Sequence, residues 1–407
     1  MPGEDKCREV SIVGGTYQET CYWPEWNELF GSGWRAVRVM RSLCPDVQIN
    51  YHTVGDEQVE KMLKVYAASE KLGYSLAKTS SPIGFYYNHP LATPIIQGGE
   101  PEWCNLNVNG KHVISFGMLE ATAQIEGEWV VYDPQSPKNP LSFREQGGKA
   151  EHLALVLNKS EARRLSGETE LEAIKKALFE KEGCECLVVK CGAEGARVYV
   201  SEDDKGTVIP VYKTRHVWPI GSGDVFTTVY AYYWFSGSKA ADAAMNASKA
   251  VAAYCEGQGD VDRVADAVRE GTAYEEFVPK KQGRVYLAGP FFTLSQKLFV
   301  SECRNLLRAM GVNVFSPYHD VGEGKAEDVV PKDIEQLKNC SCVFAIVDGL
   351  DSGTLFEVGY AVSLGMKVVA YVENETEGAL KMLAGTGCDI EKDFTTAMYK
   401  TCWYAAE

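Results

Sequence analysis

From residue 284 onwards the chain alternates short apolar segments with longer segments of helical character, and this alternation limits the folds that it can adopt. Strands are expected at 284–290, 312–316, 342–347 and 367–372, and helices at about 295–310, 328–338 and 354–364. Parallel strands need a long crossover, usually a helix, and helices then cover both faces of their sheet. The sequence therefore predicts a parallel α/β sheet in this part of the chain.

At 407 residues the chain is long for a single core, so two domains are the better expectation. The stretch 275–283 holds charged residues, a proline and a glycine between apolar segments, a composition typical of linkers. We therefore expect one domain over residues 1–280 and a smaller one over residues 281–407. The first domain also mixes strands with helices, but the segment at about 80–125 shows too little periodicity to assign.

Charge and composition exclude several classes of partner. The formal net charge of −15 lacks the basic footprint of a nucleic-acid-binding protein. No apolar run is long enough to span a membrane, and the first residues do not form the apolar core of a signal peptide. The 13 cysteines and six histidines lack zinc-ligand spacing, so buried free thiols are expected and no metal site among these residues. We expect a cytoplasmic protein that binds small molecules, with no nucleic acid or membrane as a partner.

Three carboxylates are candidates for chemistry: Asp351 and Glu357, on either side of the turn that follows the strand at 342–347, and Asp333, in the helix expected at about 328–338. Open α/β sheets keep their ligands at the carboxyl ends of the strands, so Asp351 and Glu357 are expected to face one pocket. Cleavage of an N-glycosidic bond builds positive charge on the sugar. One carboxylate can then attack the anomeric carbon while the others hold hydroxyl groups or protonate the base.

A tight turn, Ser352-Gly353-Thr354, lies between Asp351 and Glu357. Its hydroxyl and N–H groups would stand at a helix start, which suits an anion such as a 5′-phosphate. In the alternative interpretation, Ser352 and Thr354 simply cap the helix and Glu357 is their capping-box partner.

Residues 286–292 (Tyr-Leu-Ala-Gly-Pro-Phe-Phe), the Lys332-Asp333-Ile334 helix and residues 351–361 together resemble the nucleoside 2-deoxyribosyltransferase family, over about residues 284–373. That family cleaves N-glycosidic bonds on a flavodoxin-like fold, through a covalent glycosyl–glutamate and without a cofactor. The resemblance implies these roles: Glu357 as nucleophile, Asp351 at the 5′ side of the sugar, Asp333 near the base, and Tyr286 and Gly289 as pocket walls.

One departure from this family bears on the reaction. Family transferases often carry an Asn-Leu-Met-like segment near the C-terminus that reaches the pocket of a neighbouring subunit. The corresponding stretch here, 393–398, has Thr396 where that asparagine would stand. Hydrolysis of a nucleoside or nucleoside 5′-monophosphate is therefore our first expectation. A deoxyribosyltransferase that exchanges bases is the alternative.

In the first domain, Gly221-Ser222-Gly223-Asp224 precedes a long helix expected at about 224–236. A glycine turn at a helix start exposes N–H groups that can neutralise a phosphoryl group, and the adjoining aspartate can take a proton from an attacking hydroxyl. By itself the pattern also fits an ordinary strand-to-helix turn with an aspartate cap.

Three further segments strengthen the phosphoryl-transfer interpretation. They are Asn158-Lys159-Ser160-Glu161, the strand and turn at 188–196, and the strand and turn at 129–135. In this order they resemble the ribokinase-like (PfkB) family of sugar and nucleoside kinases, over about residues 10–270. The resemblance implies these roles: Asp224 as catalytic base, Gly221, Ser222 and Gly223 as anion hole, Asn158 and Glu161 around magnesium and phosphate, and Gly192 and Gly195 along ATP.

The sugar-binding half departs from the kinase pattern. The family usually has an aspartate shortly after the first strand and an asparagine in a glycine-rich helix start. Here the first strand runs into Gly14-Gly15-Thr16, and Trp34 and Arg35 stand where the asparagine is expected. The domain is therefore either an active kinase or a domain that binds a nucleotide, with ATP and Mg²⁺ as its expected ligands.

The combined expectation is an α/β protein: a ribokinase-like three-layer domain followed by a smaller flavodoxin-like parallel-sheet domain. Its activity would be N-glycosidic cleavage fused to a kinase. In another hypothesis, a non-catalytic kinase-like domain senses a nucleotide and gates the second domain. Both families are commonly oligomeric, so at least a dimer is expected.

Overall fold

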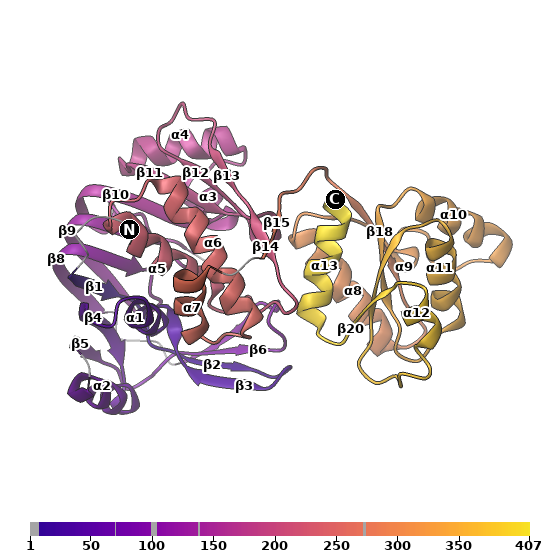
Figure 1. Ribbon diagram of the computed structural model, residues 1–407, viewed down its shortest axis with the longest axis horizontal. Coiled ribbons are helices and arrows are strands. Elements are labelled where there is room, and N and C mark those ends of the chain that lie inside the picture. The colour runs from indigo at the N-terminus through magenta and orange to yellow at the C-terminus, as the bar shows by residue number, and fades with distance from the viewer. Residues whose placement is uncertain (1–7, 70, 99–103, 137–138, 272–273) are drawn as a thin grey trace. The chain divides into compact units, whose positions relative to one another are not determined.

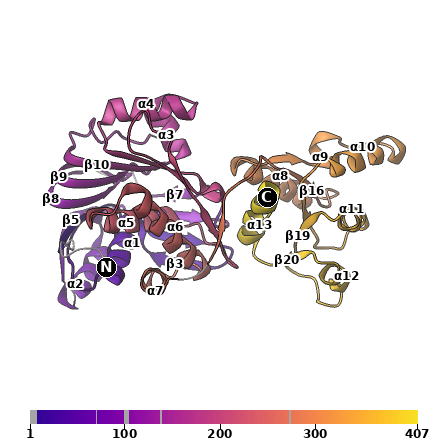
Figure 2. The same cartoon turned by 45° about the horizontal axis from the view of Figure 1, so that its top comes forward.

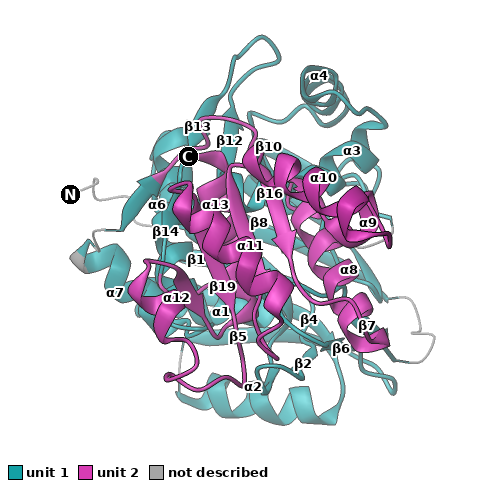
Figure 3. Ribbon diagram, turned by 90° about the vertical axis from the view of Figure 1, so that its right-hand side faces the viewer, with its two compact units in different colours: residues 1–214, 218–276 teal, residues 215–217, 277–407 magenta. Residues whose placement is uncertain are grey.

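The computed structural model describes residues 8–69, 71–98, 104–136, 139–271 and 274–407 (Figure 1). Its residues group into two compact units (Figure 3). Unit 1 comprises Met1–Thr214 and Trp218–Glu276, and unit 2 comprises Arg215–Val217 and Phe277–Glu407.

Unit 1 is built on a nine-stranded sheet with the order β13-β12-β11-β10-β9-β8-β1-β4-β5. Its strands are β1 (Glu9–Val13), β4 (Gln48–Gly55), β5 (Leu72–Lys78), β8 (Cys104–Phe116), β9 (Ala121–Asp133), β10 (Lys149–Asn158), β11 (Cys186–Lys190), β12 (Ala196–Tyr199) and β13 (Thr207–Ile209). The β11–β12 and β12–β13 pairs are antiparallel, and the other neighbours in this sheet run parallel.

Helices cover both faces of this sheet, which gives the three layers expected from the sequence (Figures 1 and 2). They are α1 (Gly31–Leu43), α2 (Glu57–Ser69), α3 (Lys159–Ser166), α4 (Leu171–Glu182), α5 (Ser222–Phe235), α6 (Ala240–Glu256) and α7 (Asp262–Glu270). Side chains alternate between the faces of a strand, so β10 supplies both cores. Its Ala154 and Val156 pack in the core that includes α1, α5 and α6, and Leu155 and Leu157 pack in the core that includes α3 and α4.

A second, four-stranded sheet with the order β3-β2-β6-β7 completes the regular structure around the cavity described below. Its strands are β2 (Gln18–Cys21), β3 (Trp26–Leu29), β6 (Gly84–Tyr87) and β7 (Ile95–Gln97). The segment at about 80–125, unassigned from sequence, therefore holds three strands and the start of a fourth. The stretch 275–283, expected to be a linker, begins with the short strand β15 (Glu275–Phe277), which pairs with β14 (Val211–Lys213).

Unit 2 contains five parallel strands in the order β17-β16-β18-β19-β20. They are β16 (Arg284–Ala288), β17 (Asn313–Phe315), β18 (Cys342–Ile346), β19 (Lys367–Tyr371) and β20 (Asp389–Glu391). The helices are α8 (Leu294–Ala309), α9 (Pro317–Asp320), α10 (Ala326–Lys338), α11 (Ser352–Ser363), α12 (Lys381–Gly385) and α13 (Phe394–Ala406). This strand order is flavodoxin-like, and its switch point lies between β16 and β18, where such sheets bind ligands.

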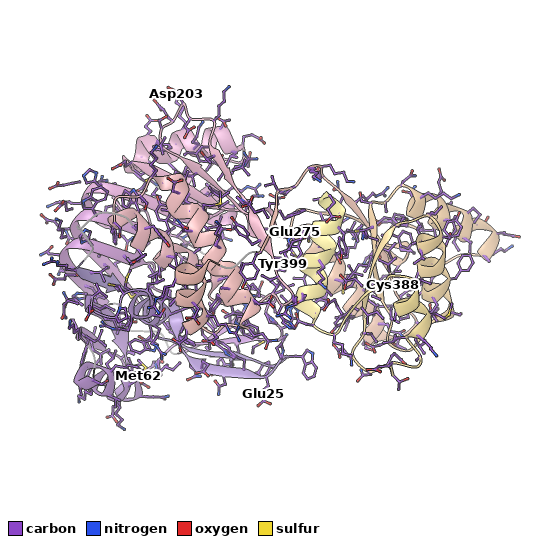
Figure 4. All side chains as sticks on the ribbon, in the orientation of Figure 1. Glu25, Met62, Asp203, Glu275, Cys388 and Tyr399 are labelled. Carbon is purple, nitrogen blue, oxygen red and sulfur yellow. The ribbon has the colours of Figure 1, made fainter. Side chains whose placement is uncertain are left out.

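The cysteines that the structure describes are each buried or half-buried, and Cys388, labelled in Figure 4, is one of the buried ones. Among the described residues, no helix has both the length and the apolar character needed to cross a bilayer.

Candidate active sites

In unit 2, Glu357 lies on α11 and is half-buried. Val358 and Ala361 of the same helix pack in the core together with Tyr286 and Ala288 of β16, so Tyr286 faces α11. The Tyr286 hydroxyl donates a hydrogen bond to Glu357 Oε1 over 2.5 Å. Glu357 therefore has one oxygen held by a phenol at the β16–β18 switch point, and Oε2 is the oxygen available for chemistry.

The electrostatic surroundings of Glu357 favour its neutral form. Burial raises the pKa of this carboxyl to about 7, with Asp333 and Asp351 adding to the rise, whereas the hydrogen bond from Tyr286 opposes it. Burial and the Glu357 carboxylate in turn raise the pKa of the Tyr286 phenol far above its usual value, so the phenol remains a donor. Asp333 and Asp351 are thus both within electrostatic reach of Glu357.

Asp333 lies on α10 with its Oδ1 atom buried and without a hydrogen-bond partner. Burial raises the pKa of this carboxyl above its ordinary value, and Lys332 opposes the rise. A buried carboxyl oxygen without a donor carries an unmet desolvation cost. A bound ligand with an N–H or O–H group would satisfy it, and the raised pKa suits a group that delivers a proton.

Asp351 is the N-cap of α11, because its Oδ2 accepts from the backbone N–H of Thr354 at 2.8 Å and from the Thr354 hydroxyl at 2.9 Å. Thr354 is buried, whereas Ser352 and Gly353 are exposed at the helix start. The helix is therefore capped, as in the alternative interpretation, but the N-cap is Asp351 and not Ser352 or Thr354. The cap does not include Glu357, whose partner is the phenol on β16.

Gly289 follows β16 directly and marks a close approach between strand ends. A Cβ atom added there would stand 3.1 Å from Cδ1 of Ile346 at the end of β18. The glycine thus lets the two strands that flank the switch point end close together.

Sequence reasoning did not single out a pair of aromatic rings near the same sheet edge. Phe291 follows β16 and Tyr318 follows β17, and the ring centroids lie 5.4 Å apart in a stacked arrangement. Both strands are parallel neighbours, so both residues come from carboxyl ends. An aromatic residue just after each strand could have indicated this pair, but the two residues are 27 positions apart in the sequence and no local pattern links them.

The segment that reaches a neighbouring pocket in family transferases is internal here. Thr396 lies on α13 and is fully buried, as are Ala397 and Met398. The Thr396 hydroxyl oxygen accepts a hydrogen bond from the Val217 backbone N–H at 3.0 Å. Because this segment is packed within its own chain, it is not exposed to enter the pocket of another copy.

In unit 1, a cavity of about 610 Å³ collects the residues expected to hold a nucleotide. Asn158, Glu161, Gly192, Gly195, Ser222 and Gly223 all line it. Gly221, the remaining member of the predicted anion hole, precedes α5 with a φ of 74°. The volume of this cavity lies within the range of about 300–1,000 Å³ that is usual for ligand pockets.

Asn158 and Glu161 form a capping box at the start of α3. The Asn158 side chain accepts from the N–H groups of Ser160 and Glu161, both at 2.9 Å, and Glu161 Oε2 accepts from the Asn158 N–H at 2.8 Å. Burial, together with the Asp133 carboxylate, raises the pKa of Glu161 to about 7. A cation bound here would offset this cost, so the pair fits the magnesium role that the sequence suggested.

Lys190 supplies positive charge to the same cavity, and sequence reasoning did not select it. Its Nζ atom pairs with Asp133 Oδ2 at 2.5 Å, and a Cβ atom added at Gly223 would lie 3.4 Å from that Nζ. The Asp133 oxygen also accepts from the Thr227 hydroxyl at 2.7 Å. A lysine next to the anion turn suits a bound phosphate group.

Asp224 lies in the first turn of α5 and is buried. Its Oδ2 accepts from Arg35 Nη1 at 2.6 Å, and its Oδ1 accepts from the Gln135 side-chain amide. Arg35 also pairs with the buried carboxylate of Glu19. The predicted catalytic base is therefore part of a buried ionic cluster. In the sequence, Arg35 at the place of the expected asparagine was the feature that pointed to this cluster.

Two protein families match different parts of the chain. Residues 120–265 match the model of the pfkB family of carbohydrate kinases, and residues 285–394 match the model of the nucleoside 2-deoxyribosyltransferase family. The pfkB match lies in the middle of the chain and leaves out residues 10–119, where the sequence departs from the kinase pattern. No curated protein matches the chain.

Solved structures similar to the chain include kinases. Ribokinase from Thermotoga maritima is 16% identical, with 64% of this chain and 99% of that chain covered and a TM-score of 0.48. Nucleoside kinase from Methanocaldococcus jannaschii is 16% identical, with 66% and 100% covered and a TM-score of 0.46. Ribokinase from Cryptococcus neoformans var. grubii in complex with ADP is 14% identical, with 66% and 99% covered and a TM-score of 0.49.

The two family matches fall in different units of the structure. The chain thus joins a region that matches the pfkB carbohydrate kinase family to a region that matches the nucleoside 2-deoxyribosyltransferase family.

Proposed function

We propose that unit 2 hydrolyses the N-glycosidic bond of a nucleoside or nucleoside 5′-monophosphate, with Glu357 as the nucleophile. The observation that carries the proposal is the hydrogen bond from Tyr286 to Glu357 Oε1 at the sheet switch point. This bond orients the carboxylate on α11 and stabilises its charged form. It leaves the second oxygen for attack on the anomeric carbon of the sugar.

Two chemical steps follow from this arrangement. First, Glu357 Oε2 forms an ester bond with the anomeric carbon while the bond to the base breaks, and the Asp333 carboxyl group gives its proton to the departing base. Second, water attacks the same carbon and Asp333 takes a proton from that water. The ester breaks, which releases the sugar and regenerates the Glu357 carboxylate.

Hydrolysis is favoured over base exchange by the burial of Thr396, which lies fully inside the chain on α13. Exchange requires the glycosyl-enzyme to wait for a second base. The segment that contributes to a neighbouring pocket in family transferases is not exposed here, so water is the expected acceptor.

The test is base release from a panel of nucleosides and nucleoside monophosphates, with and without an added free base. Wild-type protein should release base and free sugar, and Glu357→Ala should lose the activity. Glu335→Gln, which changes an exposed carboxylate on α10, is the matched control and should behave as wild type. Continued base release by Glu357→Ala would contradict the assignment, and a new nucleoside formed from the added base would establish transfer.

The covalent step has a separate test. A 2′-fluoro-substituted nucleoside slows breakdown of the ester, because fluorine destabilises positive charge on the sugar. Mass spectrometry should then find the sugar attached to the peptide that contains Glu357. A sugar attached to another residue would contradict the proposed nucleophile.

We also propose that the protein acts in the cytoplasm as at least a dimer. Unit 2 exposes several large apolar side chains, including Phe292 at 72%, Leu294 at 75% and Leu298 at 62%. Apolar side chains of this size are common at protein interfaces. Light scattering should report a mass of at least two chains, and a monomer would contradict this part of the proposal.

A further inference from the structure

Arg35 stands at the centre of a buried ionic cluster in unit 1. The residue is 1% exposed, and its guanidinium contacts Asp224 Oδ2 at 2.6 Å. The same group pairs with both oxygens of Glu19, which is itself buried. A guanidinium held between two buried carboxylates is fixed in place, because loss of either partner would leave charge uncompensated.

The glycine turn is shaped around this arginine. Gly221 has a φ of 74°, and a Cβ atom added there would lie 2.2 Å from Cζ of Arg35. The guanidinium therefore packs directly against the turn that precedes Asp224. On the other side of the aspartate, the Gln135 amide donates to Oδ1.

Both oxygens of Asp224 thus accept hydrogen bonds from the protein. A general base has to accept a proton from a substrate hydroxyl within hydrogen-bond reach. The cluster therefore opposes the proton transfer that a kinase base performs.

A second observation concerns the floor of the sugar-binding half. A Cβ atom added at Gly15 would lie 2.0 Å from Cζ of Tyr17, so the Tyr17 ring covers this glycine. The Tyr17 hydroxyl donates to Glu120 at 2.7 Å. The glycine segment that follows the first strand is thus covered by an aromatic ring, and Glu120 is already occupied by a phenol.

The residues expected to hold a nucleotide line the cavity itself. Ser222 and Gly223 line the cavity, and Lys190 Nζ lies next to Gly223. Asn158 and Glu161 line it from the start of α3. Positive charge, backbone N–H groups and a carboxylate that a cation would stabilise are the groups that hold a magnesium nucleotide.

We propose that Arg35 takes the place of an acceptor hydroxyl next to Asp224, so that unit 1 binds a nucleoside triphosphate with Mg²⁺ but does not transfer its phosphoryl group. Unit 1 is then a nucleotide-binding unit built on a kinase fold. This inference is independent of the reaction proposed for unit 2.

Two measurements on the full chain test the proposal. A non-hydrolysable ATP analogue with Mg²⁺ should bind saturably in calorimetry, and Gly223→Asp should weaken that binding at least tenfold, because a carboxylate next to Lys190 repels phosphate. With γ-labelled ATP and a panel of pentoses and nucleosides, wild-type protein should form no labelled ester above the level of Asp224→Asn.

A charge-balanced variant tests the role of Arg35 directly. Glu19→Gln combined with Arg35→Asn removes one negative and one positive charge and takes the guanidinium away from Asp224 Oδ2, while the Gln135 amide still donates to Oδ1. ATP turnover, to water or to an acceptor, should rise at least tenfold over wild type, and adding Asp224→Asn should abolish the gain.

Three results would overturn the proposal: wild-type phosphoryl transfer that Asp224→Asn removes, absence of analogue binding by wild type, or a double variant that binds the analogue without any gain in turnover. The comparison of wild type with Asp224→Asn does not depend on whether the double variant folds.

Discussion

The phenol of Tyr286 controls the protonation of Glu357, and Tyr286→Phe isolates this effect. The substitution removes one hydroxyl and keeps the ring that packs in the core of unit 2. Glu357 must be ionised to attack, so base release should rise with pH through the pKa of this carboxyl, which is about 7. Loss of the hydrogen bond destabilises the ionised form, so the rise should move to higher pH.

The size of the effect follows from the contact. A hydrogen bond to a charged group contributes about 1.5–3 kcal/mol, and about 1.36 kcal/mol changes a pKa by one. The pKa of Glu357 in the variant should therefore be about one to two higher than in wild type. At pH 7 the ionised fraction would fall from roughly one half to between about a tenth and a hundredth, and base release would fall about five- to fiftyfold.

The assay is the pH dependence of kcat/KM for a glycoside whose leaving group, 4-nitrophenolate, needs no proton from Asp333, measured between pH 5 and pH 10 on wild type and Tyr286→Phe. The two curves should approach each other at the alkaline end, where Glu357 is ionised in both proteins. If the rise stayed at the same pH in the variant, the phenol would not set the charge of Glu357. If the rate stayed low at pH 10, Tyr286 would have another role.

Four further outcomes are expected. Glu357→Gln should stabilise the protein against urea at pH 8 by about 1–3 kcal/mol and leave it unchanged near pH 4. The reason is that the pKa of Glu357 in the folded protein lies above its unfolded value of about 4.3. The contribution of Glu357 to the free energy of unfolding is therefore fully present below about pH 4.3 and is lost as the pH rises to about 7. Asp333→Asn should slow base release about 100-fold, and 7-methylguanosine, whose base already carries a positive charge, should restore the rate. Thr396→Asn should leave the ratio of hydrolysis to transfer unchanged in product analysis, because the position is buried. Gly33→Ala should lower thermal stability by about 1–3 kcal/mol, since its Cβ would lie 2.6 Å from the Gly14 carbonyl oxygen.

The sequence was sufficient where an element is buried on both faces. The four strands predicted for unit 2 begin and end within two residues of their predicted limits, because β16, β18 and β19 are short apolar runs between helices; the fifth strand, β20, was not predicted. The strand β8 was not predicted, although its first half alternates buried or half-buried residues with exposed ones, because it contains three asparagines and a glycine, which strands disfavour. Helix α13 was not predicted because three of its buried residues are threonines, so its buried face is little more apolar than its exposed face.

The two sites differ in how much the sequence could reveal. Asp351 caps α11 and Glu357 lies on the same helix, so their spacing in the sequence was enough to predict that they are neighbours. The Tyr286–Glu357 bond joins residues 71 positions apart, and the Arg35–Asp224 bond joins residues 189 positions apart. No local pattern encodes such pairs, and only the packed fold shows that the predicted base of unit 1 is already bound.

The position of α13 in unit 2 has a consequence for synthesis of the protein. This helix packs on β18 and β19, and it ends at Ala406, 35 residues after β19 ends at Tyr371. Until α13 has left the ribosome and packed, the sheet face that it covers stays open, so a partly folded unit 2 offers a binding site to chaperones that recognise exposed hydrophobic strands.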